Sequence, residues 1–262
     1  MKRSLIILFA LSITSVVSAQ FKHEVGVQVG FNQTLYRLNT PIDKNNISGD
    51  PSKLHKEPLN GIKLGFIYDV TFVKGFGLST SFNYSYGAHT SKWEPYPYDA
   101  QGKLILFNPL YDYKYRAESH RIELALNMQY KFTIADNTYI MLYTGPAFQY
   151  VAQYNATDYF REHEFSPQLP AGFIGAYGYN ADEMEKYYKR WNVTWGVGAG
   201  FQYDRYFIRG GYSFGLVNPY KYNSFGDMEE IQADLKDPRQ STHGRMDQWE
   251  ISLGIYFWQS DK

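Results

Sequence analysis

Apolar and polar residues alternate at every second position over long stretches of this chain. The stretch "NVTWGVGAGFQY" (192–203) has glycine, Thr194 and Gln202 on one face and, on the other, Val193, Trp195, Val197, Ala199, Phe201 and Tyr203. Side chains at alternate positions of a β-strand point to opposite faces of the sheet. The pattern therefore predicts a strand with one face against protein or lipid, and the other against a polar or narrow space.

Seven further stretches repeat this alternation, at 24–36, 61–72, 76–88, 121–132, 138–154, 206–216 and 248–258. Each is long enough for the roughly 9–11 residues that a tilted membrane strand needs. The stretch 138–154 is less regular, and Pro146 within it predicts a bulge or bend. Aromatic side chains lie at the predicted strand ends: Tyr68, Tyr130, Trp191, Tyr203 and Trp249. Tyrosine and tryptophan suit the membrane interface, where the ring is buried in lipid and its polar atom contacts water.

The connections between these strands alternate between short and long. Short turns follow the second, fourth and sixth strands, at 73–75, 133–137 and 204–205, and long segments follow the others, at 39–59, 90–115, 155–188 and 218–246. This parity is typical of bacterial outer-membrane barrels, with short periplasmic turns and long external loops. We predict an all-β fold, an eight-stranded antiparallel up-and-down transmembrane β-barrel; a hairpin hidden in 155–188 would make ten strands. The main rival is a secreted soluble β protein.

The first residues have the pattern of an export signal. "MKRSLIILFALSITSVVSAQ" has Lys2 and Arg3, an apolar run, and small residues before Gln20. We predict a signal peptide at 1–19 and a barrel domain at 20–262; an uncleaved anchor is the alternative, but the apolar run is short for it. The balanced charge of 26 basic and 26 acidic residues gives no indication of a nucleic-acid partner. Without cysteine, the chain has no thiolate metal site.

Two of the long loops carry helical patterns. "NADEMEKYYKRW" (180–191) begins with a capping asparagine, and "GDMEEIQADLKDP" (226–238) has apolar residues at helical spacing before Pro238. Both short helices are expected outside the cell. Two interpretations stay open for them: a binding surface, together with the apolar stretch 170–179, or a cap packed over the barrel mouth.

Short motifs add a family resemblance. With "GYSFGLVN" (211–218), "YTGPAF" (143–148) and a leader ending in Ala-Gln, the chain resembles the small outer-membrane β-barrel proteins of Bacteroidota, often grouped as PorT-like. The resemblance implies a passive envelope role, adhesion, or support of a type IX secretion system, with envelope or secretion proteins as partners. It also implies insertion by the barrel-assembly machinery, although "QSDK" follows the terminal Phe257 and Trp258 here. It supplies no catalytic residues.

The positions predicted to face the lumen include four acids and four bases: Glu24, Lys63, Asp69, Arg121, Glu123, Lys131, Arg209 and Glu250. Inside a closed sheet these groups can neutralise one another through charge-assisted hydrogen bonds. We favour a structural polar core that fills the barrel, because eight strands leave an interior only wide enough for side chains. A narrow transport channel or proton path is the alternative. Arg121 is expected to pair with Glu250 or with a cross-strand neighbour of Glu123.

A membrane-embedded lipid-modifying enzyme is the other alternative. Ser119 and His120 are adjacent on a strand and therefore point to opposite faces, which prevents a direct catalytic pair. On the outer face, Arg116 and His120 are candidate contacts for lipopolysaccharide phosphate, so outer-membrane lipid and lipopolysaccharide are the expected partners. The remaining histidines have no metal-binding spacing. We therefore expect no catalytic residues, no metal and no cofactor.

Overall fold

The structure is a computed structural model that describes residues 21–38, 58–95, 111–162, 175–179, 189–219 and 244–260. The predicted signal peptide at 1–19 and the predicted helix at 226–238 lie outside these residues. The predicted helix at 180–191 also lies outside them, apart from its last three residues, of which Trp191 begins a strand.

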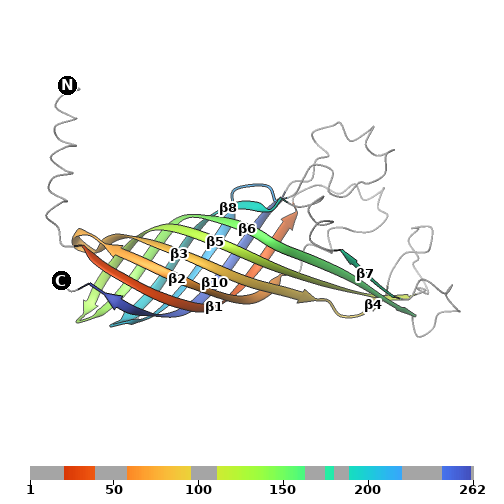
Figure 1. The fold of residues 1–262 in the computed structure, drawn as a ribbon, viewed down its shortest axis with the longest axis horizontal. Helices are drawn as coiled ribbons and strands as arrows, with labels where there is room; N and C mark the ends of the chain where they lie inside the picture. The colour runs from red at the N-terminus through yellow and green to blue at the C-terminus, as the bar shows by residue number, and fades with distance from the viewer. Residues whose placement is uncertain are drawn as a thin grey trace, which may run out of the picture.

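Eight strands close into a ring, as predicted (Figure 1). Each strand pairs antiparallel with its neighbours, and β1 closes the ring against β10. In ring order the strands are β1 (Lys22–Leu38), β2 (Leu59–Thr71), β3 (Phe76–Thr90), β5 (Tyr111–Ala135), β6 (Thr138–Glu162), β8 (Trp191–Tyr203), β9 (Tyr206–Gly215) and β10 (Gly244–Gln259). Closure pairs the backbone groups that a sheet edge would expose to hydrocarbon.

Two short strands lie beyond the ring. β4 (Glu94–Pro95) pairs with the start of β5, and β7 (Gly175–Tyr179) pairs with the end of β6. The hairpin considered within 155–188 therefore exists, but it extends the sheet outside the barrel. The ring keeps eight strands because β5 and β6 pair directly with each other.

β5 and β6 are longer than the sequence predicted. Both have 25 residues, so parts of the predicted loops 90–115 and 155–188 are strand. The last pair between β6 and β8 is Tyr150 with Trp191, and β6 continues to Glu162. At about 3.3 Å per residue these extra residues project roughly 40 Å along the strand direction. Figure 1 shows this β5–β6 overhang, flanked by β4 and β7, projecting away from the barrel.

The three predicted short turns lie at the barrel end that also carries the first and last described residues (Figure 1). A single 3-10 turn, η1 (Val73–Gly75), joins β2 to β3. Positive φ angles occur at Lys74, Gly75, Asn137 and Asp204. Glycine, asparagine and aspartate tolerate this region better than other residues, which explains how these connections can be so tight.

The predicted bulge near Pro146 is displaced. The register between β5 and β6 is the same on both sides of Pro146, although the ladder is interrupted between Ala125 and Met128. Proline has no N–H to donate, so it breaks a rung without adding a residue. The ladder shifts register at two other places. One lies at Thr133–Ala135 near the turn, and the other lies farther out, where His120 pairs with Gln153 and Arg121 with Val151, leaving Ala152 as the extra residue.

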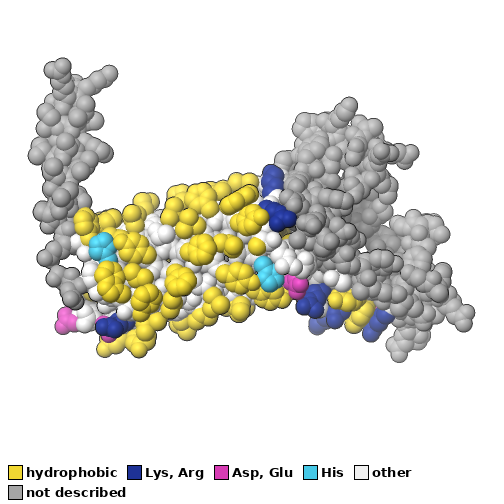
Figure 2. Space-filling model, viewed as in Figure 1, with side chains coloured by type: hydrophobic (Ala, Val, Ile, Leu, Met, Phe, Trp, Pro, Cys, Tyr) yellow, Lys and Arg dark blue, Asp and Glu magenta, His cyan; other side chains and the backbone are white. Residues whose placement is uncertain are grey.

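The outer wall is apolar. Figure 2 shows hydrophobic side chains covering the visible face of the barrel, with charged side chains gathered toward its ends. Exposed side chains on this wall include Val29, Ile62, Leu64, Phe66, Phe82, Leu124, Leu126, Leu142, Val197, Phe201, Ile251 and Leu253. This inverts the usual arrangement of a water-soluble protein, whose large apolar side chains are mostly buried. Strand alternation therefore presents its apolar face to lipid and its polar face to the lumen.

Among the described residues, no helix has the length and apolar character needed to span a membrane.

Candidate functional site

The lumen holds all eight of the charged side chains that alternation placed there. Glu24 and Asp69 are fully buried, Arg121 is 1% exposed, and Glu250 is the most accessible of the set, with 23% of its side chain exposed. A buried charge is costly unless it is paired and hydrogen-bonded. Their contacts therefore decide whether this interior is a stable core or an open path.

The first cluster lies toward the three short turns. The Asp69 carboxylate accepts hydrogen bonds from Arg209 Nη2 at 2.5 Å and from the Tyr256 hydroxyl at 2.6 Å, and it lies 3.2 Å from Lys131 Nζ. Lys131 also pairs with Glu24. Glu24 accepts two amide hydrogen bonds at 2.9 Å, from Gln202 and Gln259. Strands from opposite sides of the ring thus meet across the lumen.

The second cluster lies at mid-barrel. Lys63 Nζ is 2.9 Å from Glu123 Oε1 and 2.5 Å from Glu250 Oε2, so one ammonium bridges β5 and β10. The amide nitrogen of Gln149 donates to Glu123 at 2.7 Å, and that of Asn83 donates at 3.1 Å. These amides supply donors that a single ammonium cannot provide to two carboxylates.

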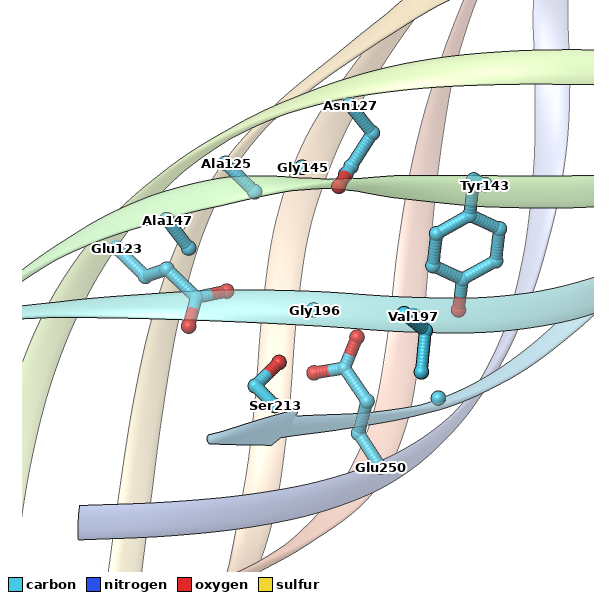
Figure 3. Close-up of a pocket in the computed structure, with 11 residues that line it drawn as sticks. Glu123, Ala125, Asn127, Tyr143, Gly145, Ala147, Gly196, Val197, Ser213 and Glu250 are labelled. Carbon is cyan, nitrogen blue, oxygen red and sulfur yellow. The ribbon is translucent and has the colours of Figure 1, made fainter. Parts of the chain in front are cut away.

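A small cavity adjoins this cluster (Figure 3). Its volume is about 30 Å³, and small residues form much of its wall, including Ala125, Gly145, Ala147, Gly196 and Gly211. Glu123 and Glu250 extend into it from opposite strands, with the Tyr143 hydroxyl nearby (Figure 3). A cavity of this size holds about one or two water molecules, and it is far below the roughly 300 Å³ of a small-molecule site.

Tyr143 fills the space beside this cavity. A Cβ atom added at Gly198 would come within 2.2 Å of the Tyr143 ring, so the glycine leaves room for the aromatic side chain. The small residues of β8 thus face a narrow lumen, as the sequence indicated, and the ring of Tyr143 occupies part of it.

Arg121 does not have the partner that the sequence predicted. Its guanidinium donates to Thr34 Oγ1 at 2.5 Å, to Gln248 Oε1 at 3.3 Å and to the sulfur of Met246 at 3.6 Å. Among the described residues, no carboxylate forms an ion pair with it. The curvature of the closed ring brings β1 and β10 over Arg121, and both offer neutral acceptors at that level.

Two apolar layers were missed by the sequence analysis. One consists of Tyr36, Leu59, Tyr115, Ala117, Tyr154 and Met246 at the end with the long connections, and the other of Ile67, Met141, Phe207 and Tyr256, which pack against the Asp69 cluster. The alternation itself held the signal, because these large residues occupy inward positions of the strands, as Ile67 and Met141 do between exposed apolar neighbours. With the two charged clusters, these residues occupy much of the described interior.

The predicted lipopolysaccharide contact lies on the outer face at the extracellular side. Arg116 pairs one to one with Glu118 at 3.3 Å, and a ring nitrogen of His120 lies 2.5 Å from the Tyr84 hydroxyl. A hydrogen bond from Asn155, aided by the charge of Arg116, holds the pKa of Glu118 below its usual value. Ser119, by contrast, is fully buried on the inner face.

Comparisons with known proteins agree with this architecture. The sequence profile of the family described as "Outer membrane protein beta-barrel domain" matches residues 18–220, which is more than half of the chain. No curated protein matches the chain.

Solved structures of similar shape are distant in sequence. Ail, the attachment invasion locus protein of Yersinia pestis, is 11% identical, with a TM-score of 0.35 over 90% of this chain and 99% of Ail. Neisserial surface protein A is 9% identical, with a TM-score of 0.37 over 92% and 99% of the two chains. The outer membrane protease OmpT of Escherichia coli is 8% identical, with a TM-score of 0.33 over 92% and 97%. Likenesses at this level carry no argument about function.

Proposed function

Since this chain belongs to the outer membrane protein beta-barrel domain family and its place is the bacterial outer membrane, we propose that it is a closed barrel with a structural or surface-binding role. The observation that carries this proposal is the filled lumen. Two ion-paired clusters and two groups of buried apolar side chains occupy the described interior, and a cavity beside the mid-barrel cluster has room for about one or two water molecules.

The alternatives have less support from the geometry. A transport path needs a continuous column of water, whereas buried apolar side chains lie at the end with the long connections and among the Asp69 cluster. A lipid-modifying enzyme would need a nucleophile and a base on the lipid-facing side. Ser119 is buried inside and His120 faces outward, so this pair supports a role without catalysis.

The β5–β6 overhang is the part best suited to meet a partner. Trp93, beside β4, lies between two cations, with Lys114 Nζ 5.7 Å and Arg161 Cζ 4.5 Å from its ring centre. Arg161 also pairs with Asp112 at 2.9 Å across β5 and β6. These contacts hold the outer end of the overhang in one arrangement. A stiff extension of this kind can present the neighbouring loops to other envelope proteins, including those of a secretion system.

Site-specific photo-crosslinking in living cells tests this role. A photoreactive residue at position 161, in the overhang, is compared with one at Asp136, in a periplasmic turn. Crosslinked partners that depend on position 161 alone support surface binding. Adducts that form only at position 136 would indicate a periplasmic accessory role and contradict the proposal.

The finer family assignment is part of the proposal. We place the chain in the PorT-like group of Bacteroidota because of the motifs "GYSFGLVN" and "YTGPAF". Partners of the position-161 adducts that belong to a type IX secretion system would support this placement, and partners unrelated to secretion would favour an adhesive or passive role.

A further inference from the structure

Two arginines face each other at the extracellular end of the wall. Arg37 of β1 is the direct cross-strand partner of Arg245 of β10. Their side chains are 50% and 46% exposed. Like charges placed directly opposite in a sheet repel each other, so this pair is unfavourable unless something offsets it.

One buried carboxylate holds both arginines. Asp247 Oδ2 lies 2.5 Å from Arg37 Nε and 3.1 Å from Arg245 Nε, and it accepts a hydrogen bond from the Tyr212 hydroxyl at 2.8 Å. The other oxygen accepts the backbone N–H of Gly215 at 3.4 Å. Asp247 is fully buried and can offset only one of the two positive charges. Both arginines contact Asp247 through Nε, and among the described residues no second carboxylate forms an ion pair with either of them. Their terminal nitrogens can therefore donate to a further anion.

The pair lies just above the lipid-facing band. On the same two strands, Gln33 pairs with Trp249, and the indole N–H of Trp249 donates to Gln33 Oε1 at 2.6 Å. Tryptophan in this position marks the boundary between hydrocarbon and headgroups. The arginines are four positions farther along each strand, or about 13 Å along the strand direction. They therefore stand at headgroup level, beyond the exposed Ile251 and Phe31.

The predicted contact at Arg116 and His120 lacks this surplus charge. Arg116 is matched by Glu118, and His120 is engaged by Tyr84. Among the described residues, the group formed by Arg37, Arg245 and Asp247 has two cations for one anion, and both arginine side chains are about half exposed. Arginine binds phosphate through paired N–H donors, which makes this group the better anion site.

We propose that Arg37 and Arg245 together bind a phosphate group of lipopolysaccharide in the outer leaflet, with Asp247 positioning both guanidinium groups. Because the two arginines lie at headgroup level, they should bind the phosphate of a membrane lipid more tightly than free phosphate. The bound phosphate neutralises the surplus charge and relieves the repulsion between the two arginines. This site is separate from the overhang and does not depend on the proposed surface-binding role.

The single variants Arg37→Gln and Arg245→Gln give a sharp test. Each variant keeps one arginine, which stays paired with Asp247. The surplus positive charge is therefore removed, and the carboxylate still has a cationic partner. Without lipopolysaccharide, each variant should be as resistant to heat as the wild type, since a repulsion has been removed. Binding of lipopolysaccharide, followed by native mass spectrometry of the purified barrel, should weaken by about 10-fold or more, as expected for loss of a charge-assisted hydrogen bond.

Matched ligands and a control variant complete the experiment. Arg116→Gln should change lipopolysaccharide affinity less than about 2-fold, because that charge is already offset by Glu118. Dephosphorylated lipopolysaccharide should bind the wild type as weakly as intact lipopolysaccharide binds the variants, and inorganic phosphate alone should show no comparable binding. Unchanged binding in both glutamine variants, or equal binding of the dephosphorylated lipid, would overturn the proposal. Inorganic phosphate binding as tightly as the lipid would overturn its membrane-anchored part.

Discussion

Arg209 of β9 reaches across the lumen to Asp69 of β2, with Nη2 2.5 Å from Oδ2, although 140 residues separate them in the chain. Both side chains are buried, and the two strands are not neighbours in the ring. The pair therefore ties opposite walls together, and its stability depends on both partners being present.

Replacing Asp69 with asparagine should lower the free energy of unfolding by about 3–5 kcal/mol, because it leaves the buried Arg209 without a carboxylate. Urea unfolding in lipid vesicles measures this change. Asp136→Asn, in an exposed turn, is the control and should be near neutral. The double variant Asp69→Asn with Arg209→Met should lose less than the sum of the two single variants. Simple additivity would show that the pair is not coupled.

A pair of glycine substitutions tests the close approach of β2 to β3. A Cβ atom at Gly61 would lie 1.8 Å from the carbonyl oxygen of Tyr86, whereas at Gly210 the nearest atom is 3.6 Å away. Backbone atoms cannot move aside as a side chain can, so Gly61→Ala should cost about 1–3 kcal/mol. Gly210→Ala should be neutral or slightly stabilising. The same unfolding assay compares them, and equal effects would contradict the register between these strands.

The lipid-facing wall should not tolerate charge. Leu126 is 43% exposed and lies well inside the apolar band of β5, so Leu126→Arg should cost about 2–4 kcal/mol. Tyr203→Arg, at the periplasmic rim, should cost about 0–1 kcal/mol. Resistance to SDS at room temperature, read as the folded band on a gel, reports the difference. If Leu126→Arg folded as well as Tyr203→Arg, the assignment of the membrane-facing side would be wrong.

Cysteine labelling tests the orientation, and the chain offers a clean background because it has no cysteine of its own. A cysteine at Lys92, beyond the end of β3, should react with an impermeant maleimide in intact cells. A cysteine at Asp136 or Asp204 should react only after the outer membrane is opened. Labelling at the turns in intact cells, with Lys92 protected, would invert the topology.

Much of the fold was readable from the sequence because one physical rule governs it. A strand with lipid on one side and a lumen on the other must alternate, so the eight strands, their turns and the inward set of charges all follow from period-two patterning. The ends of β5 and β6 were not predicted, because their pairing with β4 and β7 continues where no membrane imposes the pattern.

The partners inside the lumen were harder to predict. Alternation says which side a residue faces, but not which residue meets it across a closed ring, and Arg121 illustrates this. It was expected to meet a carboxylate, and the ring brings Thr34 and Gln248 to it instead. The Arg37–Arg245 pair was missed for the same reason, since it exists only once β1 closes against β10.

The most direct test of the filled barrel is the conductance of the purified protein in planar lipid bilayers. Charged clusters centred on Asp69 and Lys63 and the buried apolar side chains around Tyr36 and Met141 crowd the described interior. The protein should therefore show no large, stable conductance once inserted, as expected for a small barrel whose interior is packed with side chains. A steady open channel on the order of a nanosiemens, far above what a side-chain-filled interior permits, would contradict the account and make transport the better explanation.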